Sequence, residues 1–484
     1  MAVRIRKSVW SLPQGDPAIT WYRKAVETLL AKDVNDPTSW RYLACVHGVP
    51  DGMDTPPAAE DFWEQCQHQS WFFLSWHRGY IAAFEAVIAR TIADLGGPAD
   101  WALPYWDYSE SLKTNPKARL MPPDFFDRTV DGKPNALWSR RANVSNGDFG
   151  LDDSVVSLHA LTFKKFSGAA PGAPTGFGGP VTGFHTGGGP SGGLENIPHN
   201  RIHTQIGGSN GFMSFPSTAA LDPIFWLHHC NIDRLWEVWR NQAGQGTDFK
   251  NPTTANWLSD VTFNMHDGDG KAFTYVSADV LDTTRFMHGY KYDKVPVPQA
   301  PALETLEVAM AAADEHGQPE LAGASQGGPV TLEGTVTKID VPLVAKTKTK
   351  SFLESTIPTP QHVYLSLENI TGVGAPGDYR VYLDMPGAGQ PPVLAGVLTT
   401  FGLERASDSA RTHGGSGLNH VFDITELAPG LGLTGGTVSG LKVSFERVGV
   451  AASTTESPPG LESIAVPAPR ESSIKVGQIN LFYD

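Results

Sequence analysis

Residues 222–236, which read DPIFWLHHCNIDRLW, decide the fold of the first half of the chain. Asp222 suits the N-cap of a helix and Pro223 suits its first turn, so the stretch predicts a helix that begins there. The adjacent pair His228 and His229 falls within the first two turns of this helix. One of the two can therefore offer an imidazole at a fixed position near the start of the helix.

Two further histidines, His199 and His203, lie upstream and are four residues apart. On a helix both rings would project from one face and could bind the same ion. Pro198, directly before them, suits the first turn of such a helix. Together with one histidine of the pair at 228–229 they form a candidate site of three imidazoles, which leaves an open coordination position on the ion.

A second group of three consists of His47, His68 and His77. His68 and His77 are nine residues apart, so on one continuous helix they would face nearly opposite sides. They converge only if the chain bends between them, with His77 on a helix from Trp76 to Ala93 and His68 on the loop before it. A single histidine beside tryptophan is more often an ordinary core residue, but six histidines in two groups of three favour metal binding.

The residue types around the histidines narrow the choice of metal. Sites made only of imidazole suit zinc, copper, iron or nickel. The sequence offers no carboxylate at ligand spacing, which disfavours non-haem iron and hydrolytic two-metal sites. Two adjacent copper sites of three histidines each would suit the binding of dioxygen between the ions.

The composition excludes several classes of protein. The length of 484 residues predicts two or three domains. Lysine and arginine number 37 against 51 acidic residues, which gives a net charge of −14, and no basic tract argues for a nucleic-acid partner. The count of 15 histidines against 3 cysteines argues against a disulfide scaffold and leaves room for imidazole metal sites.

The N-terminal residues and the hydropathy predict a cytoplasmic protein that does not enter a membrane. Residues 1–17 contain no apolar run of the kind found in an export signal. Ile5 separates Arg4 from Arg6, so no twin-arginine pair is present. No segment reaches the roughly 18 apolar residues that a membrane span needs.

The pattern predicts a multi-domain α + β protein. We expect a mainly helical domain in residues 1–293, a proline-rich linker in 294–325 and a β-sandwich-like domain in 326–484. A segment dominated by glycine, residues 167–193, is either a surface linker or a substrate-entrance loop. Alternating apolar and polar residues predict strands most clearly at 363–367, 379–383, 441–445 and 479–483.

Three motifs together resemble one known family. Residues 73–78 read FLSWHR, residues 103–108 read LPYWDY, and the third motif is the stretch 222–236. They resemble the tyrosinase and polyphenol oxidase family of type 3, coupled binuclear copper proteins, in its long form with a C-terminal β domain. The resemblance implies a four-helix bundle around two copper ions, with dioxygen as co-substrate.

The resemblance also implies which histidines bind copper, three to each ion. In the family motif the ligand is the second histidine of the adjacent pair, so His228 would lie directly behind the ligands. One ligand comes from a loop, which agrees with the bend expected before the helix of His77. The implied ligands are His47, His68 and His77 for the first ion, CuA, and His199, His203 and His229 for the second, CuB.

Three more residues match features of the family. Cys66 and His68 have the spacing at which fungal members form a thioether between the sulfur and the imidazole, whereas the alternative is a buried free thiol. Glu195 and Asn200 match a glutamate and an asparagine that hold a water molecule, which helps to deprotonate the incoming phenol. The alternative for this pair is a helix-terminal charge and an exposed polar residue.

The function implied is that of a tyrosinase, which hydroxylates small monophenols at the ortho position and oxidises o-diphenols to o-quinones. The alternatives are a catechol oxidase, an o-aminophenol oxidase and, more remotely, an oxygen carrier of the haemocyanin type. Tyr290-Lys291-Tyr292 matches the motif that ends the catalytic domain in the family. The domain that follows can cover the active site with one side chain, which the sequence does not identify. The oligomeric state is open, a homo-oligomer being one alternative.

Overall fold

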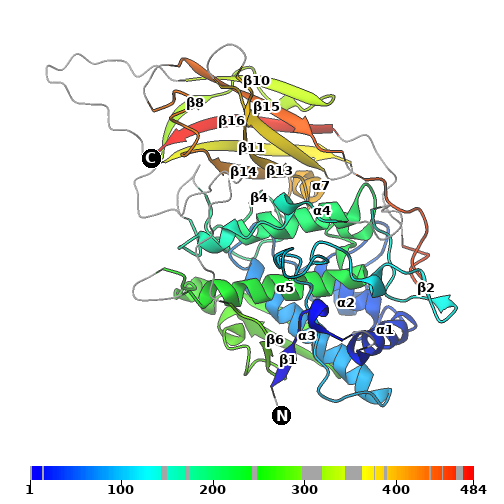
Figure 1. Cartoon of the computed structure of the whole chain (residues 1–484). Helices are drawn as coiled ribbons and strands as arrows, with labels where there is room; N and C mark the ends of the chain where they lie inside the picture. Colours follow the sequence, from blue (N-terminus) through cyan, green and yellow to red (C-terminus); the bar gives the residue numbers. More distant parts are fainter. Residues whose placement is uncertain are drawn as a thin grey trace.

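In the computed structural model, helices gather in the first half of the chain and strands in the second half (Figure 1). The helices of the described residues include none with the length and apolar character that crossing a membrane requires. The structure describes residues 3–13, 16–142, 150–168, 174–242, 248–296, 319–343, 362–374, 377–385, 390–411, 413–434, 438–449, 451–464 and 473–484.

The helical half is built around α3, whose residues are buried on nearly every face. It packs against α5, and the rings of Phe84 and Trp226 stack between the two helices with centroids 3.5 Å apart. As predicted, the Asp222 side chain caps α5, since it accepts a hydrogen bond of 3.0 Å from the backbone N–H of Ile224. The helices of this half are α1 (Pro17–Leu30), α2 (Trp40–His47), α3 (Phe73–Asp94), α4 (Arg201–Gly207), α5 (Pro223–Arg240) and α6 (Ala255–Leu258).

Small sheets border the helices. The Tyr-x-Tyr motif forms a strand that pairs in parallel with the N-terminal strand, so the two ends of the helical half lie side by side. The other two small sheets are each a pair of short antiparallel strands. The strands are β1 (Arg4–Arg6) with β7 (Tyr290–Tyr292), β2 (Thr129–Val130) with β3 (Lys133–Pro134), and β5 (Thr262–His266) with β6 (Ala272–Val276).

The second half contains two sheets around a separate apolar core, which confirms the predicted β-rich region. One sheet has the order β10-β15-β12-β13, and the other has the order β4-β14-β11-β16-β8, with β9 also paired to β16. All pairs except β4–β14 are antiparallel. The elements are β8 (Glu320–Ala324), β9 (Val330–Thr331), β10 (Val336–Pro342), β11 (Val363–Val373), β12 (Asp378–Leu383), β13 (Val393–Thr399), α7 (Leu403–Ser407), β14 (Leu418–Asp423), β15 (Gly440–Arg447) and β16 (Ser473–Tyr483).

The predicted linker lies mostly outside the described residues. Its last part does not have a linker structure, because β8 occupies residues 320–324 and pairs with β16. The first strand of the β half therefore begins before residue 326, where we expected that domain to start. The limits 1–293, 294–325 and 326–484 otherwise remain predictions.

The glycine-rich segment has an unexpected role. Its residues Gly189 and Pro190 form β4, which pairs in parallel with Leu418 and Asn419 of β14. A segment of the helical half thus becomes an edge strand of the C-terminal sheet. Close approach requires glycine here, since a Cβ atom on Gly188 would lie 2.9 Å from a backbone carbonyl of the β half.

A second segment crosses in the opposite direction. Residues 451–464 come after β15 but lie against the helical half, where Leu461 and Ile464 join its core. The Ser453 hydroxyl donates to the Gly207 carbonyl at 2.6 Å, at the end of α4. The two halves therefore interlock at two places, and both contacts hold the β half close to the face that carries α4 (Figure 1).

Candidate metal centre

Six histidines from the helices and one loop converge in the middle of the helical half. All six are at least 97% buried. His68 lies on the loop before α3, as the sequence spacing requires. His199 lies in an irregular helical turn, Glu195–Asn200, that leads directly into α4. The others are His47 at the end of α2, His77 in α3, His203 in α4 and His229 in α5.

The first triad consists of His47, His68 and His77. Their ring centroids are separated by 5.2, 5.3 and 5.6 Å. The Nδ1 atoms of His47 and His77 contact the backbone carbonyls of Pro216 and Phe73, each at 2.8 Å, which places a proton on Nδ1. The Nε2 atoms of all three rings are buried and have no hydrogen-bond partner in the part of the chain that the structure describes.

The second triad consists of His199, His203 and His229. The Nε2 atom of His229 lies 3.2 Å from Nε2 of His199 and 3.3 Å from Nε2 of His203. Nδ1 of His199 contacts Oδ1 of Asn200, and Nδ1 of His203 contacts the Met213 carbonyl, both at 2.9 Å. These contacts fix the rings so that their Nε2 atoms face one another.

The donor set fits a pair of metal ions held by imidazole. Three nitrogens about 2.0 Å from one ion lie roughly 3.3 Å apart, which agrees with the spacing in the second triad. Burial lowers the pKa of His47 and of His199 to about 3, so both rings are neutral at pH 7 and offer a lone pair. The triads adjoin, since the rings of His77 and His229 stack with centroids 4.5 Å apart.

His228 lies beside the second triad. Its ligand nitrogen is within 4.8 Å of those of His199, His203 and His229, so proximity alone does not separate the adjacent pair. Nδ1 of His228 lies 3.1 Å from the hydroxyl of Tyr108. His229 differs because it also groups with His47 and His77, which places it between the triads.

Cys66 lies next to the first triad. Its sulfur is within 4.8 Å of ligand nitrogens of His47 and His68, and the side chain is fully buried. Burial raises the pKa of the Cys66 thiol to about 11. The thioether between Cys66 and His68 remains a prediction.

Glu195 and Asn200 lie at the edge of the second triad, both buried. The Glu195 carboxylate accepts hydrogen bonds from the backbone N–H of Gln69 at 2.9 and 3.1 Å. Burial raises the pKa of Glu195 to about 8, although hydrogen bonds from the backbone of Gln69 and Gly192 oppose the shift. Asn200 contacts His199 through Oδ1 and donates through Nδ2 to the Ser191 hydroxyl at 3.2 Å.

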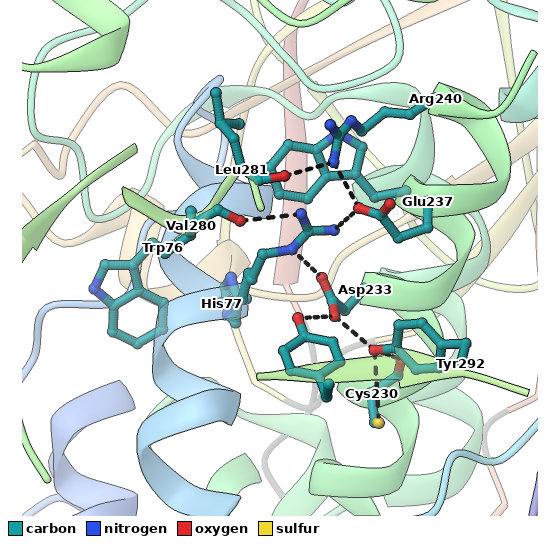
Figure 2. A network of polar contacts seen from close by, with 12 residues as sticks. Trp76, His77, Cys230, Asp233, Glu237, Arg240, Val280, Leu281 and Tyr292 are labelled. Carbon is teal, nitrogen blue, oxygen red and sulfur yellow. Dashed lines mark hydrogen bonds and ion pairs between the residues drawn. The ribbon is translucent and has the colours of Figure 1, made fainter. Parts of the chain in front are cut away.

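A buried ion pair ties α3 to α5 behind the histidines (Figure 2). Arg78, which follows His77, donates from Nε to Asp233 at 2.5 Å, and the hydroxyl of Tyr292 donates to the same carboxylate at 2.5 Å. Burial alone would raise the pKa of Asp233, but Arg78 and Arg6 outweigh it and hold this pKa below its ordinary value. The ionised Asp233 therefore clamps the helix of the first triad to the helix of the second.

One residue of the β half enters the site, and sequence reasoning did not find it. Phe401, between β13 and α7, is 1% exposed. Its ring stacks on His203 with centroids 4.3 Å apart and meets His68 and His199 edge-on at 6.1 and 5.8 Å. Gly402, which follows it with φ of +78°, turns the chain back into the β half.

Ion pairs join the two halves around Phe401. Arg201, the first residue of α4, donates from Nε to Asp378 of β12 at 3.3 Å, and the Thr204 hydroxyl donates to the same carboxylate at 3.3 Å. Burial raises the pKa of Asp378 above its ordinary value, although Arg201 opposes the shift. At the rim, Arg411 of the β half pairs with Glu64 at 2.8 Å.

Comparison with known proteins identifies the two halves. A family model for the common central domain of tyrosinase matches residues 37–242, and a model for a domain of unknown function matches residues 318–456. A tyrosinase of Hahella sp. (strain CCB-MM4) is 35% identical over 453 residues, which span 88% of this chain and 91% of the relative. A chloroplastic polyphenol oxidase of Vitis vinifera is 28% identical and matches 58% of this chain, but only 46% of its own length.

Solved structures show the same fold. A latent apple tyrosinase aligns over 100% of this chain and 98% of its own, with a TM-score of 0.59 and 19% identity. A tyrosinase from Burkholderia thailandensis aligns over 96% of this chain and 99% of its own, with a TM-score of 0.50 and 16% identity. The 35% identity to the Hahella protein extends over nearly the whole of both chains, so it supports membership of the same family as well as a shared fold. The two adjoining histidine triads thus lie in a chain that belongs to the tyrosinase and polyphenol oxidase family of type 3 dicopper proteins.

Proposed function

We propose that this chain is a copper-dependent phenol oxidase with tyrosinase activity. It hydroxylates small monophenols at the ortho position and oxidises the resulting o-diphenols to o-quinones with dioxygen. The observation that carries the proposal is the convergence of six buried histidines in two adjoining triads, with Nε2 of His229 3.2 and 3.3 Å from Nε2 of His199 and of His203. The relationship to the Hahella tyrosinase supports the same activity.

The geometry of the triads supports the ligand assignment. Two bound copper ions supply the dioxygen chemistry, and each takes three imidazoles. Backbone carbonyls and the Asn200 side chain orient the rings of His47, His77, His199 and His203. The ion pair of Arg78 with Asp233 joins the helices α3 and α5 that carry His77 and His229. His228 supports the second triad from behind rather than binding copper. We assign His47, His68 and His77 to CuA, and His199, His203 and His229 to CuB.

The proton of a monophenol needs an acceptor, and we assign that task to a water held by Glu195 and Asn200. Glu195 is a buried carboxyl group close to the second triad, and its pKa of about 8 suits proton exchange near neutral pH. Asn200 has an amide that fixes His199 on one side and reaches Ser191 on the other. Diphenols ionise more readily and depend less on this step.

We further propose a thioether between the Cys66 sulfur and the ring of His68. His68 lies on the loop before α3 and not in a helix, and the Cys66 sulfur lies within 4.8 Å of a ring nitrogen of His68. A covalent link would fix the orientation of the ring. Formation of the bond removes the thiol hydrogen and one ring hydrogen, and dioxygen, the oxidant of the proposed activity, would accept the two electrons. Mass spectrometry of the peptide that contains both residues tests the bond through the loss of two hydrogen atoms.

The β half, in our proposal, limits access to the copper centre. Phe401 occupies the face of His203 that an incoming phenol ring would approach. The side chain is buried, so substrate reaches His203 only after Phe401 moves. The freshly purified full chain is therefore expected to have low activity.

The test is oxygen uptake by the copper-loaded full chain on tyrosine, L-DOPA and o-aminophenol, measured side by side. A tyrosinase oxidises both tyrosine and L-DOPA, with a lag on tyrosine. Activity on L-DOPA alone would make the chain a catechol oxidase, and preference for o-aminophenol would make it an aminophenol oxidase. Reversible oxygenation without quinone formation would overturn the proposal in favour of an oxygen carrier.

A further inference from the structure

Gln69 directly follows the loop histidine His68 and contacts the opposite side of the site. Its backbone N–H donates to both oxygens of Glu195, at 2.9 and 3.1 Å. Its side-chain Nε2 donates to the same carboxylate at 3.3 Å. A neutral residue of the first triad's loop is thus the main hydrogen-bond donor to an acid beside the second triad.

The orientation of the Gln69 amide is fixed by its other contacts. Oε1 accepts a hydrogen bond of 3.1 Å from the backbone N–H of Gly188, so Nε2 must face the carboxylate. Nε2 also lies 3.4 Å from the hydroxyl of Ser191, which accepts from Asn200 at 3.2 Å. The one amide is therefore connected to Glu195 directly and to Asn200 through Ser191.

The backbone of Gln69 is in the left-handed region, with φ of +50°. Residues other than glycine and asparagine adopt this conformation rarely, and they keep it where the surrounding contacts require it. Here it directs the N–H of Gln69 at the Glu195 carboxylate. The side chain is 4% exposed, so no bulk water competes for these hydrogen bonds.

We propose that Gln69 is a positioning residue for the deprotonation of monophenols, a role that rests on the proposed function of the site. It holds the Glu195 carboxylate and, through Ser191, the Asn200 amide in the orientation that binds the proton-accepting water between them. It does not touch substrate or copper. Loss of the Gln69 amide therefore impairs the hydroxylation of monophenols and spares the oxidation of diphenols.

Gln69→Ala is the direct test, because alanine meets the same backbone strain at positive φ but lacks the amide. Gln69→Glu keeps the shape of the side chain and puts a second carboxyl group against Glu195. The matched control is Gln67→Ala on the other side of His68. Gln67 is also buried and accepts from the backbone N–H of His185 at 2.8 Å, but it makes no contact with Glu195 among the described residues.

The measurement is the ratio of kcat on tyrosine to kcat on L-DOPA for the copper-loaded full chain. The ratio cancels any difference in the fraction of molecules that Phe401 leaves accessible. Loss of the hydrogen bond from the Gln69 side-chain amide to Glu195 should lower the ratio about tenfold. Gln69→Glu should lower it further, while Gln67→Ala should leave it unchanged. Copper per chain should stay at the wild-type value in all three variants.

An unchanged ratio in Gln69→Ala, or an equal loss on both substrates, would overturn the inference. If Gln69→Ala does not fold, Gln69→Asn replaces it, because asparagine tolerates positive φ and is too short to keep all three amide contacts. Loss of copper in Gln69→Ala would show a structural role at His68 and would also overturn it. A wild-type chain that oxidises neither substrate would refute the proposed function itself, which is a different result.

Discussion

The ring of Phe401 lies nearly parallel to the ring of His203, with centroids 4.3 Å apart and an angle of 21° between the planes. Phe401 belongs to the β half and His203 to α4 of the helical half, so this stacking joins the two halves at the candidate copper centre. The position suits an aromatic ring, and a phenolic substrate would offer the same shape. In the proposed function this contact would block the site with a group that resembles the substrate.

Replacement of Phe401 by alanine should raise the initial rate of oxygen uptake by the full chain. Removal of a buried phenylalanine ring costs about 3–5 kcal/mol, so we expect at least about a tenfold increase on L-DOPA without proteolysis. Phe401→Leu is the matched control, since it keeps apolar bulk over His203 and should remain close to wild type. A rate for Phe401→Ala equal to that of wild type would show that the ring does not limit access.

Replacement of His203 by alanine should remove one copper ion. The remaining two histidines of its triad leave that ion with an incomplete set, whereas the first triad stays whole. We expect copper content to fall from about two ions to about one per chain, with activity at least a hundredfold lower. His288→Ala, outside both triads, should keep both ions. Full activity in His203→Ala would refute the ligand assignment.

The helices and the pair of His199 and His203 could be predicted because their signals are local, whereas the grouping of His47 with His68 and His77 and the choice of His229 depended on the family resemblance. The cap at Asp222, the proline after it and the spacing of His199 and His203 each depend on neighbouring residues alone. The position of His68 on a loop followed from its spacing to His77, which one helix does not satisfy. The strands of the β half were visible in their alternation, as at 441–445 in β15.

The contacts between the halves could not be predicted, because they depend on pairing between distant segments. β4 has only two residues and a glycine-rich surrounding, so it shows no alternation. Phe401 has the same sequence signal as any buried aromatic residue of a sheet, and only the fold directs it at His203. The role of Gln69 depends on a positive φ angle, which no neighbouring residue indicates. These three features position or cover the site rather than bind metal.

The pair Arg201–Asp378 should hold the β half in place. Both side chains are at least 94% buried, and removal of one partner from a buried ion pair costs about 3–5 kcal/mol. Asp378→Ala should therefore weaken the contact at α4 and raise the initial rate of the full chain on L-DOPA. The matched control is Glu456→Ala, which breaks a pair with Arg128 that also joins the two halves.

The control should have little effect, because the side chains of Glu456 and Arg128 are 60% and 52% exposed and exposed pairs contribute about 0–1 kcal/mol. Equal rates for the two variants would show that burial of the pair is unimportant. A drop in copper content in Asp378→Ala would indicate that the residue supports α4 itself rather than the position of the β half over the copper centre.

His420 should make the chain less stable in acid. It lies in β14 beside a cavity of about 20 Å³ that Ser191 and Asn196 line from the helical half. Its Nε2 is buried and has no hydrogen-bond partner among the described residues. Burial lowers the pKa of His420 to about 4, below its ordinary value of 6.5. The unfolded chain therefore binds more protons between pH 6.5 and pH 4, so stability falls as the pH falls through this window and is unaffected above it.

His420→Gln removes this titration, so the free energy of unfolding of the copper-free full chain should fall less between pH 7 and pH 4 than in wild type. The difference should reach up to about 3 kcal/mol, since each pKa unit corresponds to about 1.4 kcal/mol. His413→Gln, an exposed histidine of the same half, is the control and should follow wild type. Denaturant titrations at a series of pH values measure the difference. Parallel curves for His420→Gln and wild type would show that the ring is already solvated, with water in the cavity as its partner.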